Sequence, residues 1–327
     1  MISFRSCLGP EIQDFLAIRE QNCSASAYAH DRQIMEQLDR YLTKTGCSDK
    51  NLSEQTVLGW IATLSGKSST IANKVIVLRI FLNFLLGYGI HAYVPHIPKV
   101  RDDYIPYIFS ECEMDDIFRE ADSLTKGSTT VNGMLHLQMP MILRLMYGCG
   151  LRIGETLQLR MEDIDLEQGL LTLRKTKGGK QRLVPMHNSL TEILRAYCCT
   201  LGLIGNPDML LFPTNDPAVP TTPPNARHRF DRILVSANIQ VKGRKPHERG
   251  PCMHCLRHVF AFRSFSCLER SGIRTDDAIP YLSIYLGHDS LQETEKYLKF
   301  SSELFPDASE MFAQFTEELF PEVCYEE

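Results

Sequence analysis

The spacing of apolar residues over the first hundred positions constrains the fold more than any other feature of this sequence. Between residues 24 and 45 apolar side chains recur at helical spacing, which places them on one face of a helix. Residues 53–64 and 69–86 repeat the pattern, the first after a serine suited to an N-cap and the second before two glycines. Residues 1–98 are therefore predicted to form a bundle of about four helices packed around their own core.

A linker is predicted at residues 99–106, where a charged run precedes Pro106. Beyond it, Ser110 and Glu113 have the spacing of a capping box, which predicts the start of a new helix. A length of 327 residues is typical of two domains. We therefore expect a second domain over residues 107–300, followed by a C-terminal tail at 301–327.

The second domain contains one segment that is not helical in character. Between Leu170 and Met186, apolar residues flank a stretch with two adjacent glycines, which predicts a β-hairpin. The remaining segments predict helices, at residues 140–147, 153–160, 226–236, 254–271, 278–286 and 291–299. The predicted fold class is mainly α with a small antiparallel β-sheet.

Composition argues against export and against a membrane location. The N-terminal residues lack the apolar core of a signal peptide, and the most apolar run, Ile76–Ile90, is interrupted by Arg79 and Asn83. The eleven cysteines form no evident framework and are expected to be free thiols. These features favour a cytoplasmic protein.

The net charge of −5 hides an uneven distribution. The predicted tail, residues 301–327, carries acidic side chains and neither lysine nor arginine, whereas residues 227–249 contain seven basic side chains. A local basic patch is typical of a surface that binds DNA, although a solvated loop is the alternative interpretation. The candidate DNA-binding residues are Lys180, Arg182, Arg227, Arg229, Lys242, Arg244 and Lys245.

Two arginines in separate segments, Arg152 and Arg257, could stabilise a phosphodiester under attack. Such a phosphate gains negative charge on its non-bridging oxygens, and a guanidinium offers a planar fork of donors that keeps its charge. His254 lies three residues before Arg257 and is predicted to share its helical face, where it could accept a proton or hold the phosphate. Each residue alone has an ordinary structural explanation, so the inference rests on the combination.

Tyr297 is the candidate nucleophile. It follows His288 by nine residues, and His288 comes directly after Gly287 at an expected helix start, where backbone donors favour an anion. Nearby arginines would favour the phenolate form of the tyrosine. Lys177, in the predicted hairpin turn, could protonate a leaving oxygen, with Lys175 and Lys180 as competitors.

A zinc site is the competing interpretation of one segment. Pro251–Cys255 has the P-C-x-x-C half of a zinc deaminase signature, and His258 lies nearby. The other half needs H-x-E, whereas Glu248 follows His247 directly. We therefore expect no metal.

Taken together, four segments resemble the tyrosine recombinases, also called the phage integrase family. Gly150–Glu155 is similar to the first arginine box and Lys177–Pro185 to the lysine segment of the β-hairpin. His254–His258 is similar to the H-x-L-R-H box, and Leu286–Tyr297 to the last box with its nucleophile. Their order and spacing agree with the family across about residues 105–300, and residues 281–285 and those after Tyr297 resemble recombinases of transposons and integrative elements.

The resemblance implies a site-specific DNA recombinase that works through a 3′-phosphotyrosyl link. Residues 1–98 would be the core-binding domain that clamps DNA, and residues 107–300 the catalytic domain. The implied catalytic residues are Arg152, Lys177, His254, Arg257, His288 and Tyr297, with Glu155 in support.

The resemblance also implies double-stranded DNA as partner, a tetramer on two sites, and no cofactor. The acidic, amphipathic tail, residues 301–327, would either pack on its own domain or, as the family suggests, dock on a neighbouring protomer. A type IB topoisomerase and a non-catalytic DNA-binding protein are the alternatives.

Overall fold

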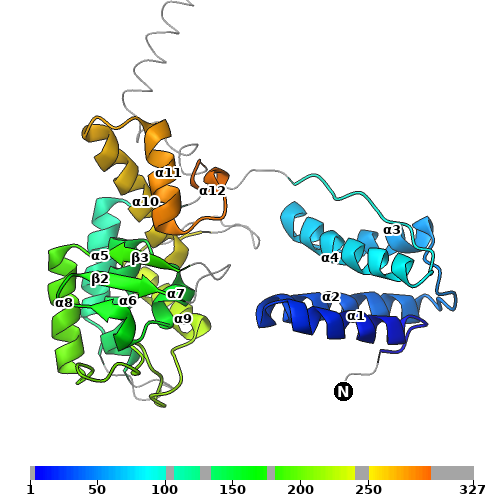
Figure 1. The fold of residues 1–327 in the computed structure, drawn as a ribbon, viewed down its shortest axis with the longest axis horizontal. Helices are drawn as coiled ribbons and strands as arrows, with labels where there is room; N and C mark the ends of the chain where they lie inside the picture. The colour runs from blue at the N-terminus through cyan, green and yellow to red at the C-terminus, as the bar shows by residue number, and fades with distance from the viewer. Residues whose placement is uncertain (1–3, 101–106, 126–133, 175–180, 240–249, 296–327) are drawn as a thin grey trace, which may run out of the picture. The chain divides into compact units, whose positions relative to one another are not determined.

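The computed structural model describes residues 4–100, 107–125, 134–174, 181–239 and 250–295. The chain divides into two compact units, Met1–Tyr104 and Ile105–Glu327, and each is considered by itself (Figure 1). Both units are mainly helical, and the second contains a small antiparallel sheet. The predicted fold class is confirmed.

The described part of the first unit contains four helices, as predicted. They are α1 (Gly9–Asn22), α2 (Ala25–Lys44), α3 (Glu54–Ala62) and α4 (Ser68–Gly87). Ser53 begins α3 as expected, because its hydroxyl accepts a hydrogen bond from the Thr56 backbone N–H at 3.2 Å.

Large aromatic side chains fill the interior of the first unit. Trp60 of α3 and Phe81 of α4 are buried, and the rings of Phe15 and Phe81 meet edge-on at 5.3 Å. Among the described helices α4 alone is long and apolar enough to cross a membrane, but a core helix of a soluble protein passes the same test. Because Phe81 and its neighbours face this core, α4 is explained as a core helix.

The second unit is built on α6, which runs through its centre. Its helices are α5 (Glu111–Asp122), α6 (Leu135–Cys149), α7 (Ile153–Leu157), α8 (Asn188–Thr200), α9 (Pro223–Ser236), α10 (Met253–Arg270), α11 (Thr275–Leu286) and α12 (Leu291–Glu295). The Ser110–Glu113 capping box is confirmed at the start of α5. The helix α6 packs against α5, α8, α9 and α10.

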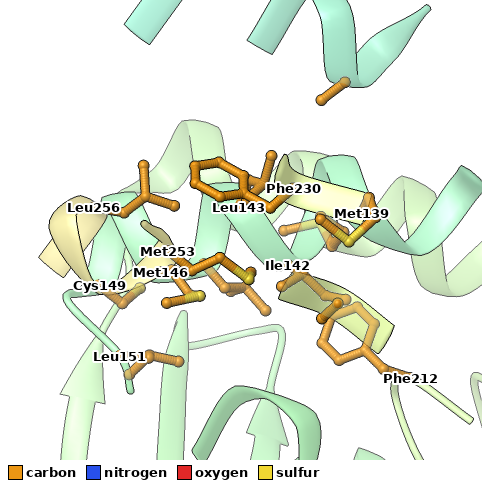
Figure 2. Packing of buried hydrophobic residues seen from close by; sticks show 14 of the residues in the cluster. Met139, Ile142, Leu143, Met146, Cys149, Leu151, Phe212, Phe230, Met253 and Leu256 are labelled. Carbon is orange, nitrogen blue, oxygen red and sulfur yellow. The ribbon is translucent and has the colours of Figure 1, made fainter. Parts of the chain in front are cut away.

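The core around α6 lies directly beside the segments that carry the candidate arginines. Figure 2 shows Met146 and Cys149 of α6 packed near Met253 and Leu256 of α10, with Leu151 at the edge of the cluster. Close packing of this kind holds neighbouring backbone in a fixed position. The residues that flank Arg152 and Arg257 in sequence are thus part of a rigid core.

The predicted hairpin is confirmed and gains a third strand. β2 (Leu170–Leu173) pairs antiparallel with β3 (Arg182–Pro185), and β1 (Ile164–Asp165) adds to the other edge of β2. The hairpin turn at residues 175–180 lies outside the described residues.

Several helix boundaries differ from the predictions. The helices α9 and α11 begin at Pro223 and Thr275, each three residues before the predicted start. The helix predicted at residues 153–160 ends at Leu157, and α6 begins well before Pro140, which lies inside it. The helix predicted at residues 291–299 begins at Leu291 as α12, and residues 296–299 lie outside the described part of the chain. The sequence pattern predicts a helix that begins at Pro140, since proline lacks a backbone N–H and fits the first turn, but tertiary packing of this apolar helix tolerates a proline in its interior.

Candidate active site

The first candidate arginine, Arg152, lies in the tight connection between α6 and α7. Gly150 ends α6 in the left-handed conformation, with φ of 62°. A side chain there would also collide with the Phe260 ring, since a Cβ would lie 2.5 Å from Cδ1. Arg152 precedes α7, and its backbone N–H donates to Glu155 Oε2 at 3.0 Å.

The second candidate arginine, Arg257, projects from α10 into the interior and is 1% exposed. Its Nη1 donates to the carbonyl of Gly150 at 2.6 Å, and its Nη2 donates to the carbonyl of Leu286 at 2.7 Å. The guanidinium therefore joins the end of α6 to the end of α11. Hydrogen bonds on both nitrogens offset the cost of burying its charge.

The two arginines meet at the C-terminal end of α11. Arg152 Nη2 donates to the carbonyl of Gly287 at 2.9 Å, one residue beyond the carbonyl that Arg257 binds. Carbonyls at the end of a helix have no partner within the helix and carry partial negative charge. This helix end thus attracts both guanidiniums and holds them side by side.

The sequence prediction of a helix start at His288 is wrong. Gly287 has φ of 64°, and its N–H donates to the carbonyl of Ile284 at 3.1 Å. The His288 N–H donates to the carbonyl of Ser283 at 3.0 Å, which completes a Schellman motif that ends α11. The backbone N–H of His288 is consumed in this turn, so it is not an anion-binding donor.

Glu155 links Arg152 to a third arginine, Arg182 of β3. Its buried carboxylate accepts from Arg152 Nη1 at 3.0 Å, from Arg182 Nη1 at 3.0 Å and from Arg182 Nη2 at 2.8 Å. Burial alone would raise the pKa of Glu155, but the hydrogen bonds from Arg182 and Arg152 outweigh it and lower the pKa to about 2. Glu155 is therefore ionised at every physiological pH.

His288 is held next to the arginines in its neutral form. Burial, followed by the positive charges of Arg257, Arg152 and Arg182, lowers the pKa of His288 to about 3. Its Nδ1 shares a hydrogen bond with the hydroxyl of Thr294 at 2.6 Å, which fixes the ring and directs Nε2 away from Thr294.

Two more histidines lie close to this group. The rings of His254 and His258 meet edge-on with centroids 4.7 Å apart. Burial, then the electrostatic influence of His254, Arg257 and His288, lowers the pKa of His258 to about 3. His254 itself is exposed, although Arg257 three residues later is buried. The structure thus brings together four predicted residues, Arg152, Arg257, His254 and His288, with Glu155 in support.

The remaining predicted residues are three arginines that the structure describes and six residues that it does not describe. On α9, Arg227 is exposed and Arg229 is half-buried; burial and Arg232 lower the pKa of Arg229. Arg182, predicted to bind DNA, has its guanidinium on Glu155 instead of free at the surface. Six residues lie outside the described part of the chain: Lys177, Lys180, Lys242, Arg244, Lys245 and Tyr297.

The residues of the zinc alternative come together only in part. The Sγ atoms of Cys252 and Cys255 are 3.6 Å apart. Within the described ranges no group of three or more histidine, cysteine or acidic side chains has the geometry of a metal site. His247 and Glu248 are not among the described residues.

Sequence reasoning missed the partnership of Arg182 with Glu155, and a signal for it was present. Arg182 and Val184 are two residues apart in β3, so their side chains lie on the same face. Val184 is buried, whereas Leu183 between them is 62% exposed. Period-two alternation therefore places Arg182 on the inward face. No sequence pattern marked Thr294 as the partner of His288, because a threonine is common in any short helix.

The fold of the second unit, together with the first, is that of the tyrosine recombinases. The XerH site-specific recombinase bound to its difH substrate matches with a TM-score of 0.68 at 18% identity, over 92% of this chain and 84% of that one. The Tn1549 transposon integrase in complex with circular intermediate DNA matches with a TM-score of 0.65 at 15% identity, over 94% and 98%.

Sequence comparison gives the family. A family model described as the phage integrase family matches residues 113–303, more than half of the chain. The y4rE protein of Sinorhizobium fredii, named as an integrase/recombinase, is 25% identical over 95% of this chain and 97% of its own length. The tyrosine recombinase XerC of Staphylococcus carnosus is 28% identical over 72% and 73%.

The chain belongs to the phage integrase family of tyrosine recombinases. By class it is a site-specific DNA recombinase, and neither the topoisomerase nor the non-catalytic alternative is favoured.

Proposed function

We propose that this recombinase attacks a DNA phosphate with Tyr297 and holds that phosphate with Arg152, Arg257 and His288. One observation carries the proposal. Two guanidiniums from segments about a hundred residues apart bind the carbonyls of Leu286 and Gly287, immediately before His288. Tyr297 lies nine residues after His288, so only a short segment joins the proposed nucleophile to the turn that both arginines bind.

The arginines supply fixed positive charge for the phosphorane-like transition state. Arg152 has 23% of its side chain exposed and is the first guanidinium that an entering phosphate would contact. Arg257 lies deeper, and it adds charge and fixes the turn from within. Donors held in advance by the fold need no reorganisation during the reaction, which makes them effective catalysts.

His288 serves as a neutral hydrogen-bonding group. Because its pKa is about 3, it carries no charge at neutral pH. The hydrogen bond from Nδ1 to Thr294 orients the ring so that Nε2 points away from Thr294, and Nε2 is proposed to contact a phosphate oxygen or the phenol. His254, exposed beside His258, is proposed as the second histidine at the phosphate.

The proposed reaction has two reversible steps. The Tyr297 hydroxyl gives its proton to His254, and its oxygen forms a bond to phosphorus while the bond from phosphorus to the 5′ oxygen breaks. Lys177 gives the leaving 5′ oxygen a proton. A 5′ hydroxyl then gives its proton to Lys177 and attacks the 3′-phosphotyrosyl link, and the released Tyr297 oxygen takes back a proton from His254. The phosphodiester energy stays in the covalent link, so neither nucleotide hydrolysis nor a cofactor is required.

The partner is proposed to be double-stranded DNA carrying a specific recombination site. The XerH, Tn1549 integrase and lambda integrase structures that share the fold were determined with DNA. We propose a tetramer on two sites, with residues 1–98 as the core-binding domain and residues 301–327 in protomer contacts. Action in the cytoplasm on a mobile element fits the transposon integrase among the structural neighbours.

Covalent capture tests the proposal. The chain is incubated with a library of nicked duplexes, denatured, and separated from free DNA, and the linked peptide is mapped by mass spectrometry. We expect a DNA adduct on Tyr297 that disappears in Tyr297→Phe while DNA binding persists. An adduct on another residue, or wild-type binding without any adduct, would overturn the assignment.

A further inference from the structure

Arg182 occupies an inward position that a DNA-contacting arginine would not need. Its side chain is 10% exposed, although it lies on the edge strand β3, where solvent is close. The strand register pairs Arg182 with Leu173 of β2, which is buried. Burying a guanidinium is costly unless it is paired and hydrogen-bonded, so its partner identifies its role.

That partner is Glu155, and the contact is bidentate. Arg182 Nη1 lies 3.0 Å from Glu155 Oε1, and Nη2 lies 2.8 Å from Oε2. Each of these oxygens also accepts one hydrogen bond from Arg152, through Nη1 to Oε1 and the backbone N–H to Oε2. The carboxylate therefore accepts four hydrogen bonds from described residues, two from each arginine, which uses its ordinary acceptor capacity.

Arg182 also touches the turn that both candidate catalytic arginines bind. A Cβ added at Gly287 would lie 2.8 Å from Arg182 Nη1 and 3.2 Å from Cζ. The guanidinium of Arg182 thus packs against the same residue whose carbonyl accepts the hydrogen bond from Arg152 Nη2. Glu155 and Gly287 are both held from the β3 side by Arg182.

We propose that Arg182 is a positioning residue for phosphate activation, which orients Arg152 by fixing Glu155 and by packing against Gly287. It acts through these neighbours and does not itself contact DNA. The assignment rests on the proposed function of Arg152. It gives β3 a direct mechanical link to the phosphate site, since β3 follows the segment that contains Lys177.

The electrostatics of Glu155 agree with this geometry. The charged groups that face Glu155 are Arg152, from the α6–α7 connection, and Arg182, from β3, while His288 and Arg257 lie beyond them around Gly287. Burial opposes ionisation of Glu155, and the hydrogen bonds of Arg182 are the largest influence in the other direction. Without Arg182, Glu155 would take up a proton at a higher pH and loosen its hold on Arg152.

The test measures cleavage and binding separately in Arg182→Ala, Arg182→Lys and a control, Arg195→Ala. Arg195 is a half-exposed arginine of the same unit whose partners are Glu167 and the Leu166 carbonyl. For Arg182→Ala we expect covalent adduct formation to slow by about 10- to 100-fold, as for other small misplacements of a catalytic group, with DNA affinity nearly unchanged. Arg182→Lys should recover part of the rate, and Arg195→Ala should match the wild type.

A pH series separates positioning from general loss of structure. The rate of Arg182→Ala relative to wild type should fall further as pH is lowered from about 7.5 to 5.5, because Glu155 then becomes protonated in the variant. Combining Arg182→Ala with Glu155→Gln should remove this acid sensitivity and slow cleavage little beyond Glu155→Gln alone. An Arg182→Ala protein that cleaves normally, or that loses DNA affinity in step with cleavage, would refute the positioning role.

A readout independent of cleavage keeps the two proposals distinct. The Glu155 carboxyl carbon, assigned with Glu155→Gln, is titrated by NMR in wild type and in Arg182→Ala. We expect a higher pKa in the variant. Absence of a DNA adduct in wild type would refute the proposed function. An unchanged Glu155 pKa in Arg182→Ala would instead refute the action of Arg182 through Glu155.

Discussion

Replacing Glu155 by glutamine should destabilise the second unit and leave the first untouched. Glutamine keeps the shape of the side chain but turns an acceptor oxygen into an NH₂ group that faces the donors of Arg152 and Arg182. The two guanidiniums then lose the negative charge that compensates for their burial. Breaking a buried ion pair in this way is strongly destabilising.

The magnitude follows from the proton affinity of Glu155. Its pKa is about 2 in the folded chain against an ordinary 4.5, and each tenfold change in proton affinity is worth about 1.4 kcal/mol. The ionised carboxylate thus contributes about 3 kcal/mol at pH 7. Because the folded pKa is the lower one, this stabilisation is complete above pH 4.5 and is lost as pH falls toward 2. At pH 3 about half of it should remain.

Urea unfolding can measure this change with an internal control. The sequence has one tryptophan, Trp60, which is buried in the first unit, so its fluorescence follows that unit alone. Far-ultraviolet circular dichroism follows both units. For Glu155→Gln we expect the dichroism transition of the second unit to shift by about 1 M urea, for a slope of about 2–3 kcal/mol/M, while the Trp60 transition stays in place.

The exposed Glu167 provides the matched variant, since it pairs with Arg195 at the surface. Glu167→Gln should leave both transitions unchanged. The reasoning would be refuted by a Glu155→Gln protein as stable as wild type at pH 7. A deficit that stays constant between pH 7 and pH 3 would equally contradict the assigned ionisation.

Three further results are expected. Arg152→Ala should bind DNA but form the covalent adduct about 10²–10³-fold more slowly, as for loss of one preorganised donor, and near-normal cutting on nicked DNA would remove Arg152 from the site. Arg257→Lys should lose both cleavage and stability, measured by adduct formation and urea unfolding, because one ammonium cannot reach the carbonyls of both Gly150 and Leu286; intact stability would contradict that bridging role. His258, with a folded pKa of about 3, should make the chain less stable as pH falls below 6.5, by about 2 kcal/mol at pH 5. His258→Asn should remove this share of the loss in urea unfolding at pH 7 and 5 and leave the share of His288, and a loss as large as that of wild type would contradict the assignment.

Much of the fold could be predicted because local patterns and the tertiary structure agree. Helical spacing gave α2, α3 and α4, and the Ser110–Glu113 capping box gave the start of α5. Two adjacent glycines between apolar runs gave the β2–β3 hairpin. The helix α8 and the strand β1 were not predicted, since β1 is too short to show a period and forms only by pairing with β2.

The candidate site could be predicted in its residue types and not in its bonds. Spacing and type selected Arg152, Arg257 and His288, and the structure brings them to one turn. At this turn the arginines bind backbone carbonyls. Every residue has a carbonyl, so no sequence motif marks the ones that are bound. The expected helix start at His288 failed for the same reason: a left-handed Gly287 can follow a helix as well as precede one.

The end of α11 gives this enzyme an unusual dependence on helix length. One added or deleted residue in an α-helix turns everything beyond it by about 100°. In α11 such a change would swing the Leu286 and Gly287 carbonyls away from both guanidiniums in a single step. An insertion or deletion within α11 should therefore be poorly tolerated, although this helix contributes no candidate catalytic side chain of its own.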